Sequence, residues 1–84
     1  MSEIHVQLTK EDIERGTRLD RWACPVALAL WRATGVKWSV GNRSCRRLGQ
    51  YKEVPLPGEV MEFIREFDEA RRVRPLEFDI KVAS

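Results

Sequence analysis

Apolar and polar residues alternate near both ends of the chain, which is the pattern of a strand with one buried face. In the segment 4–8 the apolar residues alternate with polar residues, and His5 falls on the polar side. The same alternation runs through residues 76–82. The sequence therefore predicts a first strand over 4–8, with His5 facing outward, and a last strand over 76–82.

A short helix is predicted directly after the first strand, in the segment "TKEDIERG". Thr9 can cap its first turn, and Asp12 occupies the return position of a capping box. Gly16 follows the last helical residue, where a glycine commonly stops a helix in the left-handed conformation. We expect a helix between Thr9 and Gly16.

The segment "PVALALWRAT" predicts a second, largely buried helix. Pro25 suits the first helical position, so Cys24 is the cap residue, and Gly35 ends the helix. Its apolar residues cover more than half of the helical circumference. The predicted apolar stripe comprises Val26, Leu30 and Ala33, widened by Ala27, Leu28 and Trp31.

A hairpin and a third helix follow. The segment "VKWSV" alternates like a strand, the turn "GNRS" comes next, and a second strand is expected over 45–56, with a bulge at Gly49 and a sheet edge at Pro55. The third helix has apolar residues at helical spacing, acids near its start, and Arg71 and Arg72 at its end. Its apolar residues are Val60, Phe63, Ile64 and Phe67.

The resulting order is β-α-α-β-β-α-β, and it predicts an α+β fold: one mainly antiparallel sheet with helices packed on one face. The 84 residues suffice for a single domain over 1–84. The expected core packs the second helix and the hairpin against the third helix and the last strand. Its members are Val26, Leu30, Trp38, Phe63, Ile64, Phe67, Phe78 and Ile80.

The sequence shows no pattern of a secretory signal or of a membrane-spanning segment. The chain start lacks the order of a secretory signal peptide, and the longest apolar run, 23–31, is far shorter than the ~20 residues that cross a bilayer. We therefore expect a cytoplasmic protein with no membrane contact.

The net charge of +2 hides a strong segregation along the chain. Residues 1–14 carry a net charge of −3, residues 15–52 carry +8, residues 53–69 carry −5, and residues 70–84 carry +2. Eleven of the fifteen cations are arginines, whose planar fork suits carboxylate and phosphate groups. The sequence predicts a polarised surface.

Candidate catalytic and metal-binding residues are few. Cys24 at a helix start could gain thiolate character, but nothing in the sequence links it to a base, since His5 is the only histidine. His5, Cys24 and Cys45 match no zinc spacing, and no glycine-rich phosphate loop is present. We therefore expect no enzyme activity, no cofactor and no metal, and we interpret both cysteines as packing residues.

The remaining feature is a basic surface that could bind a partner. The candidate partner-binding residues are Arg43, Arg46, Arg47 and Lys52 on the hairpin, with Arg18 and Arg21 between the first two helices. Such a cluster can bind phosphates or acidic proteins. The alternative is a solvated face that keeps the protein soluble and discourages strand pairing at the sheet edge.

At "DRWACPVALAL" the chain resembles small, mostly uncharacterised proteins of tailed bacteriophages and prophages. In these proteins a short strand and a T-x-x-x-I-x-x-G helix lead into a D-C-x-x-C-P-[IV]-A-L-A segment. The resemblance extends through "LPGEVMEFIREFD" and "PLEFDI". Arg21 stands where the pattern has its first cysteine, so Cys24 is unpaired. The matching residues are Thr9, Ile13, Gly16, Asp20, Cys24, Pro25, Val26, Ala27 and Leu28.

This resemblance implies a function in the cytoplasm of a bacterial host cell. Small phage proteins without active sites often act by stoichiometric binding to a host machine, and some inhibit CRISPR defence complexes. The implied partner is a host protein or nucleoprotein complex, with nucleic acid as a possible ligand. The oligomeric state is not predicted.

A second resemblance gives an alternative, because β-α-α-β-β-α is also the element order of the KH domain, which binds single-stranded RNA. That domain holds its ligand with a G-x-x-G loop between its first two helices. The corresponding loop here, "RGTRLD", has Gly16, but Leu19 stands at the second glycine position, and a further strand follows the last helix.

Overall fold

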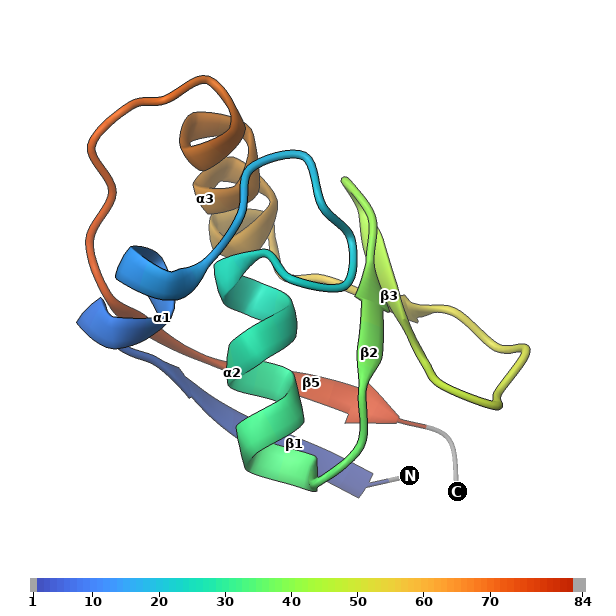
Figure 1. Ribbon diagram of the computed structural model, residues 1–84. Coiled ribbons are helices and arrows are strands. Elements are labelled where there is room, and N and C mark those ends of the chain that lie inside the picture. Colours follow the sequence, from blue (N-terminus) through green and yellow to red (C-terminus); the bar gives the residue numbers. More distant parts are fainter. Residues whose placement is uncertain (1, 83–84) are drawn as a thin grey trace.

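The computed structural model, which describes residues 2–82, has the predicted alternation of helices and strands (Figure 1). The fold is α+β, as the sequence predicts. The elements are β1 (Ser2–Leu8), α1 (Lys10–Arg15), α2 (Pro25–Thr34), β2 (Trp38–Val40), β3 (Ser44–Arg47), β4 (Val54–Pro55), α3 (Gly58–Asp68) and β5 (Leu76–Val82). None of the helices within 2–82 is long and apolar enough to cross a membrane.

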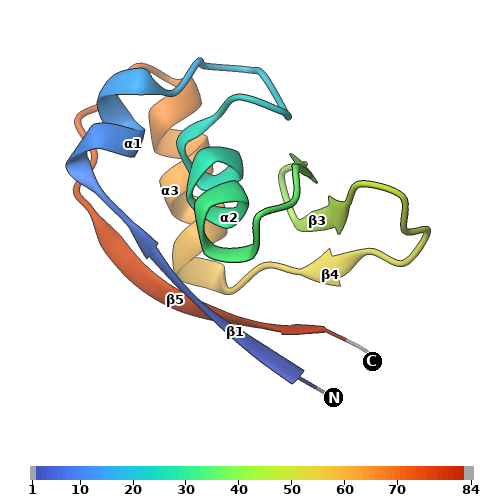
Figure 2. The same cartoon turned by 60° about the horizontal axis from the view of Figure 1, so that its bottom comes forward.

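The strands form two separate antiparallel sheets, so the prediction of a single sheet is wrong (Figure 2). β1 pairs with β5 along its whole length, from Ser2 opposite Val82 to Leu8 opposite Leu76. β2, β3 and β4 form the second sheet, in that order. The helix α2 contacts both β1 and β2, and the two sheets lie on different sides of it. A helix that is apolar over much of its circumference needs cover on more than one side.

The predicted core residues lie together in one hydrophobic cluster. Trp38 is 1% exposed, and its indole Nε1 donates a hydrogen bond of 2.9 Å to Thr34 Oγ1. Phe67 is only partly buried, where its ring stacks on Phe63 with centroids 6.2 Å apart. Two members of the predicted α2 stripe are exposed instead: Ala33 and Trp31.

The predicted caps of the first two helices are present. Thr9 and Asp12 form the capping box of α1, and the Cys24 sulfur accepts a hydrogen bond from the Ala27 amide at the start of α2. Gly35 ends α2 in the left-handed conformation, with φ of 76°. Local end signals therefore determine where α1 begins and where α2 begins and ends.

Gly16 ends α1 in a different way from the one predicted. Its φ of −69° is an ordinary value, so no left-handed conformation requires a glycine there. The glycine is needed for space, because a Cβ atom at Gly16 would lie 2.5 Å from the ring carbons of Pro25. The absence of a side chain lets the end of α1 pack against the start of α2.

This close approach makes Gly16→Ala a destabilising change. The added methyl group would press on both the ring and the backbone nitrogen of Pro25, and relieving such overpacking typically costs ~1 to 3 kcal/mol. The free energy of unfolding in urea should fall by about that amount. Gly58→Ala is the control, because its Cβ would meet no atom within 4 Å; equal losses for both variants would contradict the packing role.

Two predicted boundaries are wrong. The expected strand over 45–56 is split into β3 and β4 by the loop 48–53, since Gly49 has a φ of 86° and the Gln50 amide bonds back to the Arg47 carbonyl. The helix α3 ends at Asp68, before Arg71 and Arg72. Ala70 has a φ of 63°, and the Arg71 amide donates to the Glu66 carbonyl, which closes the helix end. Pro55 lies on an edge strand, as predicted.

An ion pair that the sequence analysis did not predict joins α1, α2 and β1. Arg32 donates to both carboxylate oxygens of Asp12, at 2.6 and 2.8 Å, and also to the Gln7 carbonyl at 2.6 Å. Asp12 is buried, whereas the Arg32 side chain is half exposed. The same carboxylate accepts the Thr9 amide at 2.9 Å, so one buried group closes the helix cap and links three elements.

Candidate partner-binding surface

The β2–β3 hairpin has a face opposite to the one that packs on the core; Ser39 on this face is buried, whereas Lys37, Arg46 and Leu48 are exposed. Trp38 pairs with Arg47 and Ser39 with Arg46, and the Leu48 amide continues the ladder by donating to the Lys37 carbonyl at 2.9 Å. Because side chains at paired positions share a face and alternate along each strand, Ser39 and Arg46 lie on the same side as Lys37 and Leu48. The opposite side carries the buried Trp38.

Neighbouring elements extend this face. The Lys37 ammonium lies 4.9 Å from the centroid of the Trp31 ring of α2. Next to the hairpin turn, the Arg21 carbonyl accepts a hydrogen bond of 2.8 Å from the Val40 amide. Arg21, Ser39 and Arg46 line one small depression together with Glu53. We call this surface the outer face and define it by five residues: Arg21, Trp31, Lys37, Arg46 and Leu48.

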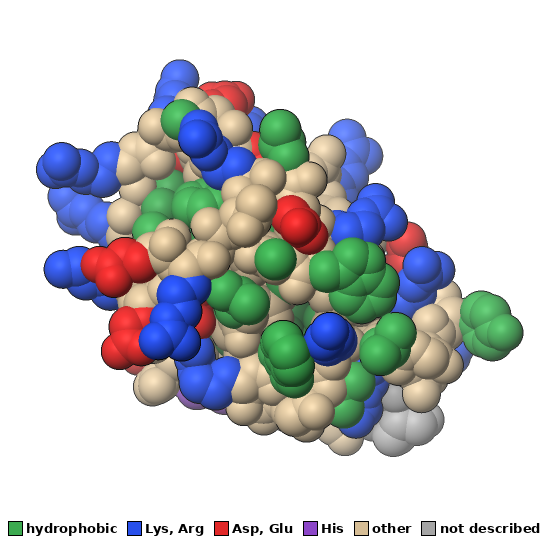
Figure 3. All heavy atoms as spheres, in the orientation of Figure 1, with side chains coloured by type: hydrophobic (Ala, Val, Ile, Leu, Met, Phe, Trp, Pro, Cys, Tyr) green, Lys and Arg blue, Asp and Glu red, His purple; other side chains and the backbone are tan. Residues whose placement is uncertain are grey.

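A hollow of about 410 Å³ adjoins the outer face at Trp31. Leu28 and Trp31 of α2 provide its apolar lining, and its charged walls are Arg15, which has no ion pair among the described residues, and Arg32 with its partner Asp12. Figure 3 shows hydrophobic side chains over α2 and beside the hairpin, with Lys and Arg side chains among and around them. The surface thus combines exposed apolar side chains with a high density of cations.

Most Lys and Arg residues of the basic segment 15–52 form no ion pair with the described residues. Of the Lys and Arg residues in the described part of 15–52, only Arg32 forms an ion pair. The carboxylate of Asp20 instead accepts the Trp22 and Ala23 amides, which fixes the loop that carries Arg21. The cations of 15–52 that form no ion pair with the described residues are Arg15, Arg18, Arg21, Lys37, Arg43, Arg46, Arg47 and Lys52.

The structure brings together only some of the residues predicted to bind a partner. Arg21 and Arg46 meet on the outer face. Arg47 lies on the other side of the hairpin, because strand alternation places it with Trp38 and Cys45, and Arg43 lines a groove beside α3. Two more are exposed in connecting loops: Arg18 in 16–24 and Lys52 in 48–53.

The exposure of five large apolar residues was not predicted from the sequence: Leu19, Trp22, Trp31, Leu48 and Tyr51. Trp31 is 43% exposed although it belongs to the predicted core stripe, and Trp22 is equally exposed. Leu48 and Tyr51, at 56% and 95% exposed, lie on and beside the projecting loop 48–53 (Figures 1 and 2). Polar neighbours on both sides of Tyr51 are the one sequence signal for its exposure, since they interrupt the strand alternation.

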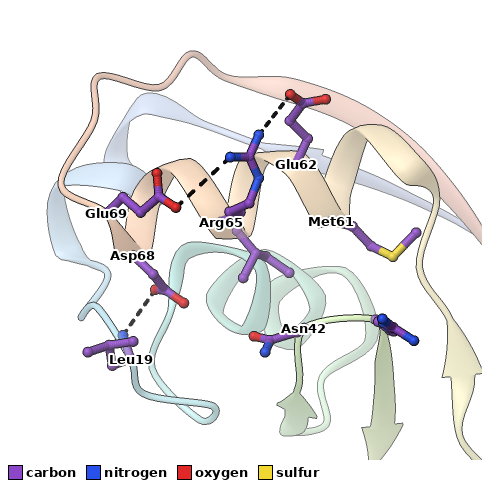
Figure 4. Close-up of a pocket in the computed structure, with 9 residues that line it drawn as sticks. Leu19, Asn42, Met61, Glu62, Arg65, Asp68 and Glu69 are labelled. Atoms are coloured by element: carbon purple, nitrogen blue, oxygen red, sulfur yellow. Dashed lines mark hydrogen bonds and ion pairs between the residues drawn. The ribbon is translucent and has the colours of Figure 1, made fainter.

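The groove beside α3 is larger but electrostatically different (Figure 4). Its volume is about 690 Å³, and Met61 and Ile64 contribute its apolar wall. Its charges are largely matched: Arg65 lies 3.1 Å from Glu62 and 3.9 Å from Glu69. Across the groove, Asp68 accepts the Leu19 amide at 3.1 Å.

The residues considered for catalysis or metal binding, Cys24, Cys45 and His5, are not grouped into one metal site within 2–82. Burial raises the pKa of the Cys24 thiol, and burial raises that of Cys45 to about 12. His5 is exposed on β1, where Asp79 and Glu77 contact its two ring nitrogens at 2.8 and 3.1 Å. The hydrogen bond and charge of Asp79, assisted by Glu77, raise the pKa of His5. Within residues 2–82, no three His, Cys, Asp or Glu side chains are grouped as a metal site requires.

Both thiols should therefore react slowly in the folded protein at neutral pH. A buried thiol with a raised pKa has little thiolate, which is the form that reacts. An aromatic disulfide reagent should modify neither cysteine until denaturant is added. Rapid modification of Cys24 in native buffer would contradict its role as a cap and packing residue.

Comparisons of the chain with protein-family models, with curated proteins and with solved structures find no match.

Proposed function

We propose that the protein is non-catalytic and acts by stoichiometric binding of a macromolecular partner through its outer face. The observation that carries this proposal is that Arg21, Lys37 and Arg46 form no ion pair with any residue of 2–82 and lie beside half-exposed apolar side chains. A cluster of cations of one sign creates a positive field that attracts a partner with acidic groups.

The composition of the outer face suits a protein or nucleoprotein interface. Arginine and tryptophan are the residues that most often dominate binding energy, and truncating one at an interface centre can cost ~2 kcal/mol or more. Arg21 and Arg46 emerge from hydrogen-bonded backbone, so their side chains start from fixed positions. Such preorganisation lowers the entropic cost of binding.

The placement of the reactive groups supports a role without catalysis. The two thiols are buried, and His5 lies on β1, engaged by carboxylates at both ring nitrogens. A general base must reach the proton that it removes, and neither thiol has His5 as a hydrogen-bond partner.

The proposed partner is a nucleoprotein complex of the bacterial host, and the best candidate is a defence complex that the protein inhibits in the manner of an anti-CRISPR protein. This step rests on the resemblance of the segment 20–30 and its surroundings to phage proteins. The cytoplasm of the host cell is the implied location. A basic surface with exposed apolar residues is compatible with blocking such a complex.

The second candidate is a single-stranded nucleic-acid-binding module, which Tyr51 favours. A freely exposed aromatic ring next to Lys52 could stack on a base while the cation contacts phosphate. The loop that a KH domain would use gives less support. Its Leu19 amide is bonded to the Asp68 carboxylate, and that negative charge opposes phosphate.

Capture from a bacterial lysate tests both candidates. The purified protein, immobilised through its C-terminus, is incubated with lysate that has or has not been treated with nuclease. We expect one set of host proteins to be retained at constant stoichiometry after nuclease treatment. Retention that occurs only before nuclease treatment would favour the nucleic-acid-binding module. Failure to retain any macromolecule in either lysate would contradict the proposed function.

A further inference from the structure

The groove beside α3 and the outer face differ in how their charges are used. In the groove beside α3, Arg65 is flanked by Glu62 and Glu69, and Asp68 is bonded to a backbone amide. On the outer face, Arg21, Lys37 and Arg46 have no ion-pair partner within the part of the chain that the structure describes. Unmatched positive charge therefore lies beside the apolar hollow, and a complementary ligand must be acidic.

We infer that the outer face binds an acidic amphipathic segment of a protein, with carboxylates on Arg21 and Arg46 and an apolar side chain in the hollow beside Trp31. This inference rests on the proposed function and names the part of the partner that makes the contact. It identifies the ligand as a protein segment rather than a nucleic-acid strand.

The carboxylate contact follows from the depression that Arg21 and Arg46 share. Their side chains come from different segments, and among the described residues that line the same depression Glu53 is the only acid. A guanidinium group binds a carboxylate through two parallel hydrogen bonds, which gives both affinity and orientation. Two arginines beside one glutamate leave an excess of guanidinium donors for acidic side chains of a partner.

The apolar contact follows from the hollow next to Trp31. Its volume of about 410 Å³ is bounded by Leu28 and Trp31, with Arg15 at its wall. That space accommodates one or more apolar side chains, and binding would remove half-exposed indole surface from water. Arg15 lies where it can meet an acidic residue next to the inserted side chain.

The apolar residues favour a protein segment over a nucleic-acid strand. Lys37 lies over one face of the Trp31 ring, so a base stacking on that face would have to displace the ammonium group. Leu48, opposite Lys37 in the hairpin, is 56% exposed and has no aromatic face to offer. Single-strand binding relies on aromatic stacking, whereas apolar contacts among arginines are typical of protein interfaces.

The spacing of these contacts fits a helical segment. Leu48 directly follows β3, and because its amide still donates to the Lys37 carbonyl, it lies two residues beyond Arg46 along an extended segment, about 7 Å away. One turn of a helix rises about 5.4 Å. An acidic residue of a helical ligand can therefore reach Arg46 while an apolar residue three or four positions away contacts Leu48. The expected ligand is therefore a helix with alternating stripes of acidic and apolar residues.

Direct titration of the purified protein tests this inference without the natural partner. The probes are a helical 18-residue peptide of Glu and Leu, the same peptide with Lys in place of Glu, and a dT20 oligonucleotide. Tryptophan emission reports binding, because Trp31 lies at the proposed contact. We expect the Glu/Leu peptide to bind at least about tenfold more tightly than either of the other probes.

Two matched variants locate the contact. Leu48→Ser should weaken binding of the Glu/Leu peptide about tenfold, because it removes apolar surface at the outer face. Leu19→Ser makes the same change at an exposed leucine beside the α3 groove and should leave the affinity unchanged. Thermal unfolding of both variants checks that each is folded.

Three results of the titration with the unmodified protein would overturn the inference: tighter binding of dT20 than of the Glu/Leu peptide, equal binding of both peptides, or no binding of any probe. A larger loss for Leu19→Ser than for Leu48→Ser would also overturn it, because the contact would then lie at the groove. These results leave lysate capture as a separate test. A complex that is still retained there would preserve the proposed function and reject only the acidic segment.

Discussion

Trp38→Ala should remove a large share of the stability of the protein. Trp38 is the largest fully buried side chain, it is 1% exposed, and its indole donates a hydrogen bond to Thr34. Replacing a buried tryptophan with alanine typically costs ~3 to 5 kcal/mol. A domain of this size has a total free energy of unfolding of only roughly 4 to 12 kcal/mol. Urea unfolding followed by far-ultraviolet circular dichroism measures the loss.

The matched control is Trp31→Ala, which makes the same change at a half-exposed position of α2. Because 43% of the Trp31 side chain already contacts water, its removal leaves a smaller cavity and should cost less. An equal or larger loss for Trp31→Ala would show that α2 packs through a different side from the one described.

Asp12→Ala should have the second largest effect on stability, a loss of about 3 kcal/mol. The variant removes two charge-assisted hydrogen bonds from Arg32 and the capping bond from the Thr9 amide. Arg32 is half exposed and can be rehydrated, which limits the loss. Glu11→Ala is the control, since Glu11 is an exposed acid of the same helix and should change the free energy of unfolding by less than about 0.5 kcal/mol.

The same carboxylate predicts a pH dependence. Burial would raise the pKa of Asp12, but hydrogen bonds from Arg32 and Thr9 outweigh burial and hold that pKa below its ordinary value of 3.8. Stability from Asp12 is therefore fully present above pH 3.8 and is lost as the pH falls through the folded-state pKa. Unfolding measured between neutral and acidic pH should show less acid destabilisation in Asp12→Asn than in the wild type. Identical acid dependence would contradict the role assigned to the Asp12–Arg32 pair.

Most helices and strands could be predicted from the sequence because the interactions that start and end them involve residues only a few positions apart. The Thr9 and Asp12 capping box, the Cys24 cap and the left-handed Gly35 each depend on neighbouring backbone groups. Alternation in 76–82 likewise reports one buried face of a strand. These features could be read from the sequence because neither the hydrogen bonds nor the periodicity depends on distant parts of the chain.

Features that depend on distant contacts were missed. Gly16 is needed because Pro25 approaches it, a requirement that the residues on either side of Gly16 do not reveal. The Asp12–Arg32 pair joins residues of different helices, and Arg32 otherwise reads as one more surface cation. The division into two sheets depends on how α2 is covered, which alternation within a single strand does not specify.

The sequence predicted that the candidate site is basic, but it did not predict which side chains lie on the same face. Summing charges along the chain identifies the basic half of the molecule, and it includes Arg21 and Arg46. It cannot separate Arg46 from Arg47, because a face is assigned only when the register of the hairpin is known. Summing charges also does not identify Trp31 as part of the site, because its exposure depends on which sides of α2 the two sheets cover.

Charge reversal on the outer face is the most direct test of the claim that this surface binds the partner. Arg21→Glu with Arg46→Glu is compared with Arg72→Glu with Arg74→Glu, which makes the same net change at exposed arginines between α3 and β5. Both variants are first checked for unchanged thermal unfolding and then used for capture from nuclease-treated lysate. The account predicts at least about a 30-fold loss of partner affinity for the outer-face variant and little change for the control. Full retention of the partner by the folded outer-face variant would contradict it.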